Sequence, residues 1–379
     1  MKRLVLCCDG TWNSPVRASV SNIEKIARSV HTGIGPDGVQ QMVFSVEGVG
    51  ARGYRVDALL GGAFGYGLSR NVVAGYRDLA LNYEPDDEIY VFGFSRGAYT
   101  ARSVAGMIAS VGLLTADALA DRRAGNLLAE AEALYRDRTP ARKAKASRFR
   151  EQHCYPQVPL TFLGVFDTVG ALGVPGITRR RSRFHDVRLS GAVQCARQAL
   201  AIDERRLTFE PCLWDVPADD DRPGGVKQVW FPGGHSDVGG GTASPGLSDV
   251  ALLWMMGEAA ACGLTFHPDR VLAQLGDDPE LVCRFTPGPV YRLLNVVKRW
   301  RHRPRFRGTR RLLAGVPLDD GFVDDVLLSD LALALTADPT SVYGRHAVNV
   351  AWWKETAGTG LAVEPVPLLN DRPRPLVLA

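Results

Sequence analysis

Short apolar runs alternate with segments that carry apolar side chains at helical spacing over residues 1–263. Runs rich in β-branched and aromatic residues, each closed by polar residues or glycine, predict buried strands. These are Arg3–Cys8, Gln41–Val46, Glu88–Phe92, Leu160–Phe166 and Val226–Phe231. The helical spacing predicts helices at Asn22–His31, Leu68–Leu81, Ala98–Val111, Ala118–Arg138, Gly191–Ile202 and Leu247–Cys262. The alternation is typical of an α/β fold, a mostly parallel sheet covered by helices on both faces.

The pattern weakens after Gly263. Residues 264–379 are rich in proline and arginine, and short helices are predicted only near Leu327–Leu335 and Val342–Trp353. We therefore expect an α/β core over residues 1–263 and a C-terminal extension over residues 264–379 that packs on it. In the core, the Leu247–Cys262 segment predicts an amphipathic helix whose Leu, Trp and Met side chains face the interior, with Ser248 as its cap.

Composition fits a soluble globular protein, with 46% hydrophobic and 23% charged residues and a net charge of +4. That charge is too small to indicate nucleic-acid binding. No apolar run approaches the roughly 18 residues of a membrane span. The apolar stretch at the amino terminus is too short for a signal peptide. Seven scattered cysteines without a C-x-x-C pair favour reduced thiols. We expect a cytoplasmic protein, with export by a dedicated secretion system left open.

Gly93-Phe94-Ser95-Arg96-Gly97 is the motif with the most specific chemistry. A buried strand is predicted before it and a helix of small apolar residues after it, which is the context of a nucleophile elbow. There the serine occupies a tight, strained turn and presents its hydroxyl above the helix amino terminus. The alternative is a plain glycine-rich turn between strand and helix. We expect Ser95 to be a catalytic nucleophile.

A serine nucleophile requires a histidine base and an acid that orients it, and in α/β hydrolases these follow the serine in the order acid, histidine. Asp167 directly follows the Leu160–Phe166 strand, and His235 follows the Val226–Phe231 strand and a Pro-Gly-Gly turn. Asp167 could alternatively be a simple cap, and His346 is the rival for the base. We predict Ser95, Asp167 and His235 as a catalytic triad.

An oxyanion hole completes such a site. The backbone N–H of Arg96, the residue after the nucleophile, is the expected first donor. Gly10 and Thr11, after the first strand, are the best candidates for the second, although an ordinary strand-to-helix turn explains them equally well. Gly61–Gly67 lacks the G-K-[ST] ending of a phosphate loop and predicts a loop bordering the site.

Four polar residues at strand ends suggest a metal site as an alternative: Asp9, Asp167, His235 and Asp237. Their spacing matches no established metal motif, so we predict neither a metal nor a cofactor.

A dense basic run is the remaining feature. It covers residues 298–311 and includes Lys298, Arg299, Arg301, Arg303, Arg305 and Arg307. A solvated surface explains most such runs. Here Trp300 and Phe306 are interleaved with the arginines, so contact with an anionic membrane surface is the functional alternative.

The sequence resembles a bacterial and fungal α/β-hydrolase family, once catalogued as a domain of unknown function, that contains the catalytic domain of one class of type VI secretion phospholipase effectors. The resemblance covers about Leu4 to Leu264 and rests on eight stretches: LVLCCDGTWN, VEGVG, GLSRNVVAGYRDL, YVFGFSRGAYTAR, GVFDTVGALG, ALAIDERR, VWFPGGHSDVGGG and LSDVALLWM. It implies a Ser–Asp–His esterase acting on lipid esters, with Ser95, Asp167 and His235 on the triad motifs.

We therefore expect a serine hydrolase of carboxylic esters, of lipase or phospholipase type, that works through an acyl-enzyme without a cofactor. Two alternatives belong to other classes. One is a non-catalytic module that keeps the fold and binds an anionic membrane or a protein partner through the basic run. The other is a metal-dependent hydrolase built on the strand-end carboxylates.

Overall fold

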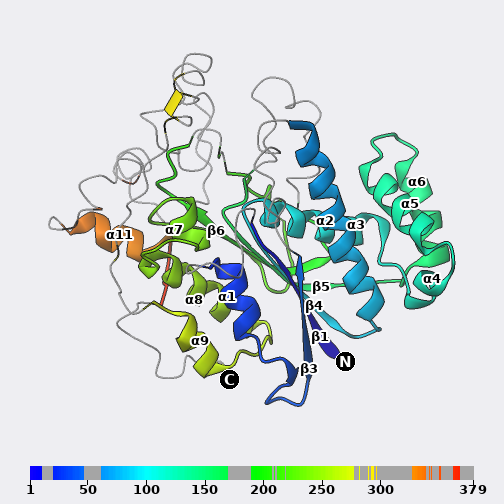
Figure 1. Ribbon diagram of the computed structural model, residues 1–379, viewed down its shortest axis with the longest axis horizontal. Helices are drawn as coiled ribbons and strands as arrows, with labels where there is room; N and C mark the ends of the chain where they lie inside the picture. The colour runs from blue at the N-terminus through cyan, green and yellow to red at the C-terminus, as the bar shows by residue number, and fades with distance from the viewer. Residues whose placement is uncertain are drawn as a thin grey trace.

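The computed structural model describes the sheet and most of the helices around it. The described residues are 1–10, 20–46, 61–169, 189–206, 209, 211–217, 219–276, 281, 289, 292–293, 296, 327–338, 341, 343, 350 and 362–367. Within them, nine strands form a single sheet in the order β2-β3-β1-β4-β5-β6-β7-β8-β9. Helices cover both faces of this sheet (Figure 1).

The strands are short and mostly buried, as their apolar runs predict. Their bounds are β1 Lys2–Cys8, β2 Gly33–Ile34, β3 Gln40–Val46, β4 Glu88–Phe94, β5 Leu160–Phe166, β6 Val193–Ala201, β7 Val226–Phe231, β8 Leu327–Ser329 and β9 Ala362–Glu364. Every neighbouring pair is parallel except the short β2–β3 pair. The α/β class and the mostly parallel sheet are thus confirmed.

The strand order reverses direction at β1, which lies between β3 and β4. In open parallel sheets, ligands bind beyond the carboxyl ends of the strands at such a switch point. Cys8 at the end of β1 pairs with Gly93 in β4, one residue before Phe94. The topology therefore brings the Asp9 loop and the Ser95 turn to the same place.

The helices form two layers. On one face lie α2 Gly61–Asn82, α3 Arg96–Val111, α4 Ala116–Ala120, α5 Ala124–Arg136 and α6 Arg142–His153. The opposite face carries α1 Asn22–Ser29, α8 Gly246–Ala261 and α9 Pro268–Gln274 (Figure 1). Two further helices, α7 His235–Gly239 and α11 Asp330–Ala337, follow β7 and β8. A separate apolar core fills the space between the sheet and each layer.

Two expectations for α8 need correction. The helix is buried on nearly every side, from Gly246 to Met256 and again at Ala259, so it is not amphipathic. Ser248 is not its cap, because the helix starts two residues earlier and the Ser248 hydroxyl donates to the Pro245 carbonyl at 2.8 Å. The helix packs between the sheet and helices α1 and α7, so little of its surface faces solvent.

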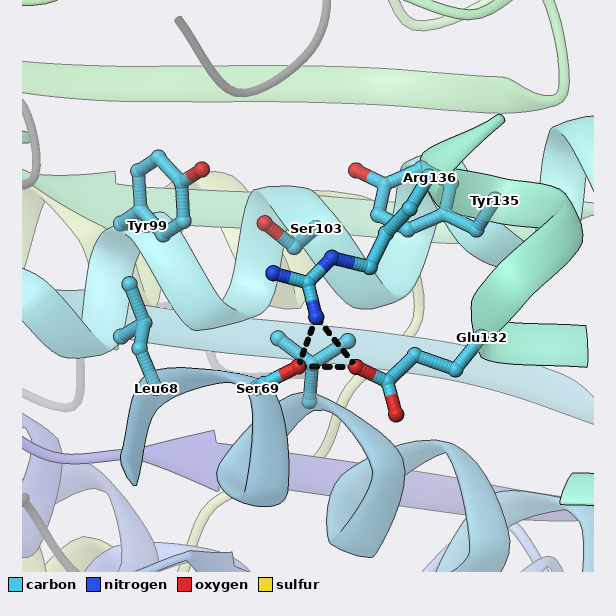
Figure 2. Close-up of a pocket in the computed structure, with 8 residues that line it drawn as sticks. Leu68, Ser69, Tyr99, Ser103, Glu132, Tyr135 and Arg136 are labelled. Atoms are coloured by element: carbon cyan, nitrogen blue, oxygen red, sulfur yellow. Dashed lines mark hydrogen bonds and ion pairs between the residues drawn. The ribbon is translucent and has the colours of Figure 1, made fainter. Parts of the chain in front are cut away.

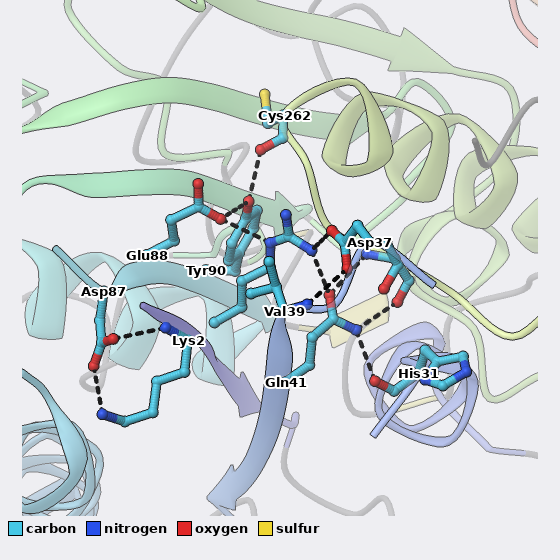
Figure 3. Close-up of polar contacts among 11 residues, drawn as sticks. Lys2, His31, Asp37, Val39, Gln41, Asp87, Glu88, Tyr90 and Cys262 are labelled. Atoms are coloured by element: carbon cyan, nitrogen blue, oxygen red, sulfur yellow. Dashed lines mark hydrogen bonds and ion pairs between the residues drawn. The ribbon is translucent and has the colours of Figure 1, made fainter. Parts of the chain in front are cut away.

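A polar network closes the opposite end of the sheet, at the amino ends of β1, β3 and β4 (Figure 3). Arg3 pairs there with Glu88 and Asp37, and the Gln41 amide donates to the carbonyls of His31 and Thr265. These hydrogen bonds and ion pairs connect the amino ends of the three strands to the neighbouring loops.

Three local predictions were wrong. Gly191–Ile202 is not a helix, since Val193–Ala201 forms strand β6 between β5 and β7. Ala118–Arg138 is divided into α4 and α5, because the chain bends at Asp121–Arg123. Gly61–Gly67 is not a loop but the first two turns of α2. In the first two cases helical spacing alone could not tell which neighbours the segment would have. At Gly61–Gly67 the glycine-rich sequence suggested a loop, but the segment continues the helix that follows it.

The C-terminal segment contributes strands to the same sheet. β8 pairs in parallel with β7, and β9 continues beyond β8. The segment predicted as a helix near Leu327–Leu335 is strand β8 followed by α11, whose N-cap Ser329 accepts from Ala332 N–H. The domain boundary at residue 263 stays a prediction.

Among the described helices, none has both the length and the apolar character that crossing a bilayer demands. The described cysteines are free thiols: Cys7, Cys8, Cys154, Cys195, Cys212 and Cys262.

Candidate active site

Ser95 is the single residue between strand β4 and helix α3. Its backbone has φ 58° and ψ −116°, a conformation that a non-glycine residue adopts only at a cost of about 1–3 kcal/mol. The strain is held by two hydrogen bonds: Ser95 N–H donates to the Phe166 carbonyl at 3.1 Å, and its carbonyl accepts from Tyr99 N–H at 3.3 Å. The predicted strand–turn–helix arrangement is therefore present.

The two motif glycines permit close packing around this turn. A Cβ atom at Gly97 would lie 2.0 Å from the Cys8 carbonyl oxygen. At Gly93, a Cβ would lie 2.6 Å from the Ala98 Cα. The first turn of α3 can thus press against the ends of β1 and β4 only because side chains are absent at both positions.

Asp167 follows β5 and is completely buried. Its φ of 38° is also left-handed, so the chain turns sharply as the strand ends. The backbone is fixed by Asp167 N–H donating to the Ala199 carbonyl at 2.7 Å, and Oδ1 accepts from Ala201 N–H at 3.1 Å. One carboxylate oxygen is thus held by β6, which leaves Oδ2 to face another group.

His235 is that group. Its Nδ1 lies 2.6 Å from Asp167 Oδ2, and both side chains are buried. Burial lowers the pKa of His235 below its usual range, while the hydrogen bond to Asp167 opposes that effect. An imidazole with Nδ1–H donated to a carboxylate and a low pKa keeps Nε2 unprotonated near neutral pH, as a general base requires.

Two aromatic rings hold the imidazole. The Phe94 ring lies 4.6 Å from it, and Phe209 meets it edge-on at 5.1 Å. Because Phe94 immediately precedes Ser95, the strand that carries the serine also packs against the histidine. Gly239 makes room for Phe94, since a Cβ there would lie 1.9 Å from the ring.

A second buried carboxylate supports His235 from the loop after β6. Glu204 accepts the backbone N–H of His235 at 3.2 Å and forms a bidentate pair with Arg206 at 2.8 and 2.7 Å. The Arg206 guanidinium lies 3.6 Å above the Phe209 ring. Glu204, Arg206 and Phe209 together form what we call the histidine support.

The oxyanion candidates are only partly described. Arg96 is the first residue of α3, so its backbone N–H lies at the amino terminus of the helix. Gly10 borders the serine, since a Cβ there would lie 3.6 Å from the Ser95 Cβ, but its N–H donates to Asp9 Oδ1 at 2.6 Å. Thr11 lies outside the described residues.

A direct hydrogen bond joins Asp167 and His235. Ser95 lies beside them, because its N–H donates to the carbonyl of Phe166, which precedes Asp167, and because Phe94, which precedes Ser95, packs against His235. No hydrogen bond joins the Ser95 hydroxyl to another described residue. The rival base His346 lies outside the described residues. Where the catalytic roles fall therefore stays a prediction.

The residues of the suggested metal site make other contacts. Asp237 accepts from Gly234 N–H at 2.8 Å and Asp9 accepts from Gly10 N–H. Within the described part of the chain, no group of three or more His, Cys, Asp or Glu side chains is arranged to hold a metal ion.

Sequence reasoning missed the histidine support. The reason is the wrong assignment of residues 191–202, because a helix there does not bring Glu204 to the carboxyl edge of the sheet. With β6 recognised as a strand, Asp203 and Glu204 would have stood out as a fourth acidic strand end.

Comparison with known proteins identifies the family. The model of the type VI secretion phospholipase effector Tle1-like catalytic domain matches residues 2–258. An uncharacterized protein of Saccharomyces cerevisiae, YEL023C, is 29% identical over 239 residues, and the match covers 57% of this chain and 33% of that protein. The chain thus spans about a third of the length of this relative.

Two solved structures are similar at low identity. The Tle1 effector bound to the VgrG spike of the type 6 secretion system is 20% identical, with a TM-score of 0.36 over 64% of this chain and 52% of that one. An uncharacterized protein from Pseudomonas aeruginosa is 18% identical, with a TM-score of 0.40 over 97% and 65%. Scores this low add nothing to the fold described above. The family match covers most of the sheet and the whole candidate site, and this chain belongs to the family of Tle1-like catalytic domains of type VI secretion phospholipase effectors.

Proposed function

We propose that this protein is a serine hydrolase of carboxylic esters, of lipase or phospholipase type. The family of phospholipase effector catalytic domains supports hydrolysis of lipids. The observation that carries the proposal for the site is the 2.6 Å hydrogen bond between Asp167 and His235, beside a serine in a strained strand-to-helix turn.

In the proposed reaction, Ser95 Oγ attacks the ester carbonyl carbon while its proton passes to Nε2 of His235. The negative charge that develops on the carbonyl oxygen is stabilised by backbone N–H groups, with Arg96 as the first donor. Asp167 stabilises the imidazolium and holds Nδ1–H. The tetrahedral intermediate then collapses, His235 gives its proton to the leaving alcohol oxygen, and the acyl group stays on Ser95.

Deacylation repeats these steps with water. His235 takes a proton from water as the water oxygen attacks the acyl carbonyl, and the proton then returns to Ser95 Oγ as the fatty acid leaves. The mostly buried site favours this chemistry, because a low local dielectric strengthens the interactions of the developing charges.

Activity-based labelling tests the proposal. A fluorophosphonate probe should label the wild-type protein at Ser95, and Ser95→Ala should abolish both labelling and the turnover of phospholipid and p-nitrophenyl esters. Ser147→Ala, at an exposed position in α6, is the matched control and should keep both. A folded wild-type protein that no such probe labels would contradict the proposal and favour the non-catalytic module.

Membrane contact through the basic run from Lys298 to Arg311 is a separate proposal, since those residues lie outside the described part of the chain. Ser95→Ala should sediment with vesicles that contain anionic lipid, and binding should fall steeply between 50 and 500 mM salt, as expected for screened charges. Salt-independent sedimentation would contradict it.

A further inference from the structure

A cavity of about 290 Å³ lies on the α2–α6 face of the sheet, and its described lining includes no residue from the carboxyl end of a strand. It is bounded by α3, by α5 and α6, by β5 and β6, and by Trp214. The catalytic proposal uses none of its lining residues. Arg102, the lining residue nearest to Ser95 along α3, is about two turns, or roughly 10 Å of helix, beyond it.

Two arginines line this cavity. Arg102 donates to the Cys212 carbonyl and, at 3.5 Å, to the Leu213 carbonyl, and its guanidinium lies 5.2 Å from the centre of the Trp214 ring. Arg142 lines the cavity from the first turn of α6. Among the described residues, neither guanidinium has a carboxylate partner, and no hydrogen bond holds the Arg142 side chain.

Several other arginines in the described part of the chain pair with a carboxylate, whereas half-buried Arg150, like Arg102, donates to backbone carbonyls. The neighbouring pocket contains Arg136, whose guanidinium contacts both Glu132 and Ser69 (Figure 2). Buried or half-buried Arg3, Arg197 and Arg206 each have a carboxylate as well. Burial lowers the pKa of Arg102, which reflects the cost of a cation enclosed without a counter-charge. An anion in the cavity would remove that cost.

The rest of the lining combines apolar side chains with Ser110, Ser190 and Tyr135. Leu163, Leu189, Val193 and Trp214 line the cavity together with the arginines, and no acidic side chain is present among its described lining residues. Its volume falls at the lower end of small-molecule sites, which run from roughly 300 to 1,000 Å³. The lining therefore suits an oxyanion head between the guanidinium groups and a short hydrocarbon chain along the leucines.

We propose that this cavity is a binding site for a small anionic amphiphile, a carboxylate or phosphate monoester on a short alkyl chain. The site is distinct from the proposed triad and does not depend on it. A structural link joins the two, because the Cys212 carbonyl accepts from Arg102 while Cys212 N–H donates at 2.9 Å to the carbonyl of Thr168, next to Asp167.

Isothermal titration with defined probes tests the site. Octanoate and octyl phosphate should bind the wild-type protein at micromolar to low millimolar concentration, and the stronger of the two identifies the head group. 1-Octanol, which lacks the charge, and acetate and inorganic phosphate, which lack the chain, should bind at least about tenfold more weakly. No heat of binding from either octyl anion would overturn the proposal.

Variants locate the binding. Arg142→Gln should raise the Kd about tenfold or more, the loss expected for one charge-assisted hydrogen bond. Ala109→Leu, which fills the cavity from α3, should do the same without changing the charge. Arg148→Gln, at an exposed position on α6, is the matched control and should bind like wild type.

Arg102→Gln is the more direct test but removes the contacts to residues 212 and 213, so its thermal unfolding is compared first; Arg142→Gln and Ala109→Leu decide the matter if it does not fold. Ser95→Ala should bind the octyl anions as wild type does, which separates this site from the proposed hydrolase activity. Unchanged affinity in both Arg142→Gln and Ala109→Leu would place the anion elsewhere and refute the proposal.

Discussion

Asp167 Oδ2 and His235 Nδ1 lie 2.6 Å apart, although 68 residues separate them in sequence. The contact exists because β5 and β7 flank β6 and end at the same edge of the sheet. Asp167 is anchored to β6 through Oδ1, and His235 through its backbone N–H to Glu204. The Asp167 carboxylate is held by its hydrogen bond to β6, and the His235 imidazole by its packing against the Phe94 and Phe209 rings.

Asp167→Asn should reduce kcat/KM by roughly 10³–10⁴ with little change in fold, because the amide fills the same space but cannot stabilise the imidazolium. The measurement is steady-state hydrolysis of a p-nitrophenyl ester together with thermal unfolding. Asp117→Asn, exposed in α4, serves as the control and should keep full activity. Loss of less than tenfold would exclude Asp167 as the acid of the triad.

The pH dependence of kcat/KM should show an acid limb below the ordinary histidine pKa of about 6.5, with a plateau from pH 7 to 8. The sign follows from burial, which lowers the pKa of His235, so the neutral base persists to more acidic pH. The unfolded chain, in which this histidine has its ordinary pKa, binds the proton more readily than the folded protein does. The free energy of unfolding should therefore fall as the pH drops from about 6.5 through the lowered pKa of His235. An acid limb centred above pH 7 would contradict this assignment.

Glu204→Gln should lower kcat about 10- to 100-fold while KM changes little, because it loosens the histidine support without removing a reacting group. The pH profile should keep its shape if only the position of His235 is disturbed. Arg206→Gln removes the bidentate guanidinium partner of the buried Glu204 carboxylate and should cost more stability, about 3–5 kcal/mol. Urea unfolding of both variants measures this difference; full activity in Glu204→Gln would show that the support is purely structural.

Gly97→Ala should destabilise the protein by about 1–3 kcal/mol or more, because its Cβ would lie 2.0 Å from the Cys8 carbonyl oxygen and neither backbone can yield cheaply. Gly257→Ala is the matched control in α8. A Cβ there meets nothing within 4 Å, so the substitution should stabilise the helix by up to about 1 kcal/mol. Chemical denaturation measures the stability of the two variants. Equal stabilities would show that the backbone around the Ser95 turn shifts to accommodate the added Cβ.

The sequence predicted best those elements whose residue pattern favours one type of secondary structure. The apolar runs ending at Cys8, Phe166 and Phe231 predicted strands, and each one is a strand. Val193–Ala201 was assigned wrongly because its sequence, VQCARQALA, combines small apolar and long polar residues that fit a helix equally well. Pairing with β5 and β7 decided its structure, and the position of Glu204 with it.

The sequence by itself determined the α/β class, the strand-to-helix turn at Ser95 and the placing of Asp167 and His235 at strand ends, because these follow from local patterns and from the geometry of parallel sheets. Only the tertiary structure decided which strand ends are neighbours, how Phe94 and Glu204 contact the histidine, and that Arg102 and Arg142 line one cavity. Strand order and the packing of distant side chains depend on the free energy of the whole fold, which no local window of sequence contains.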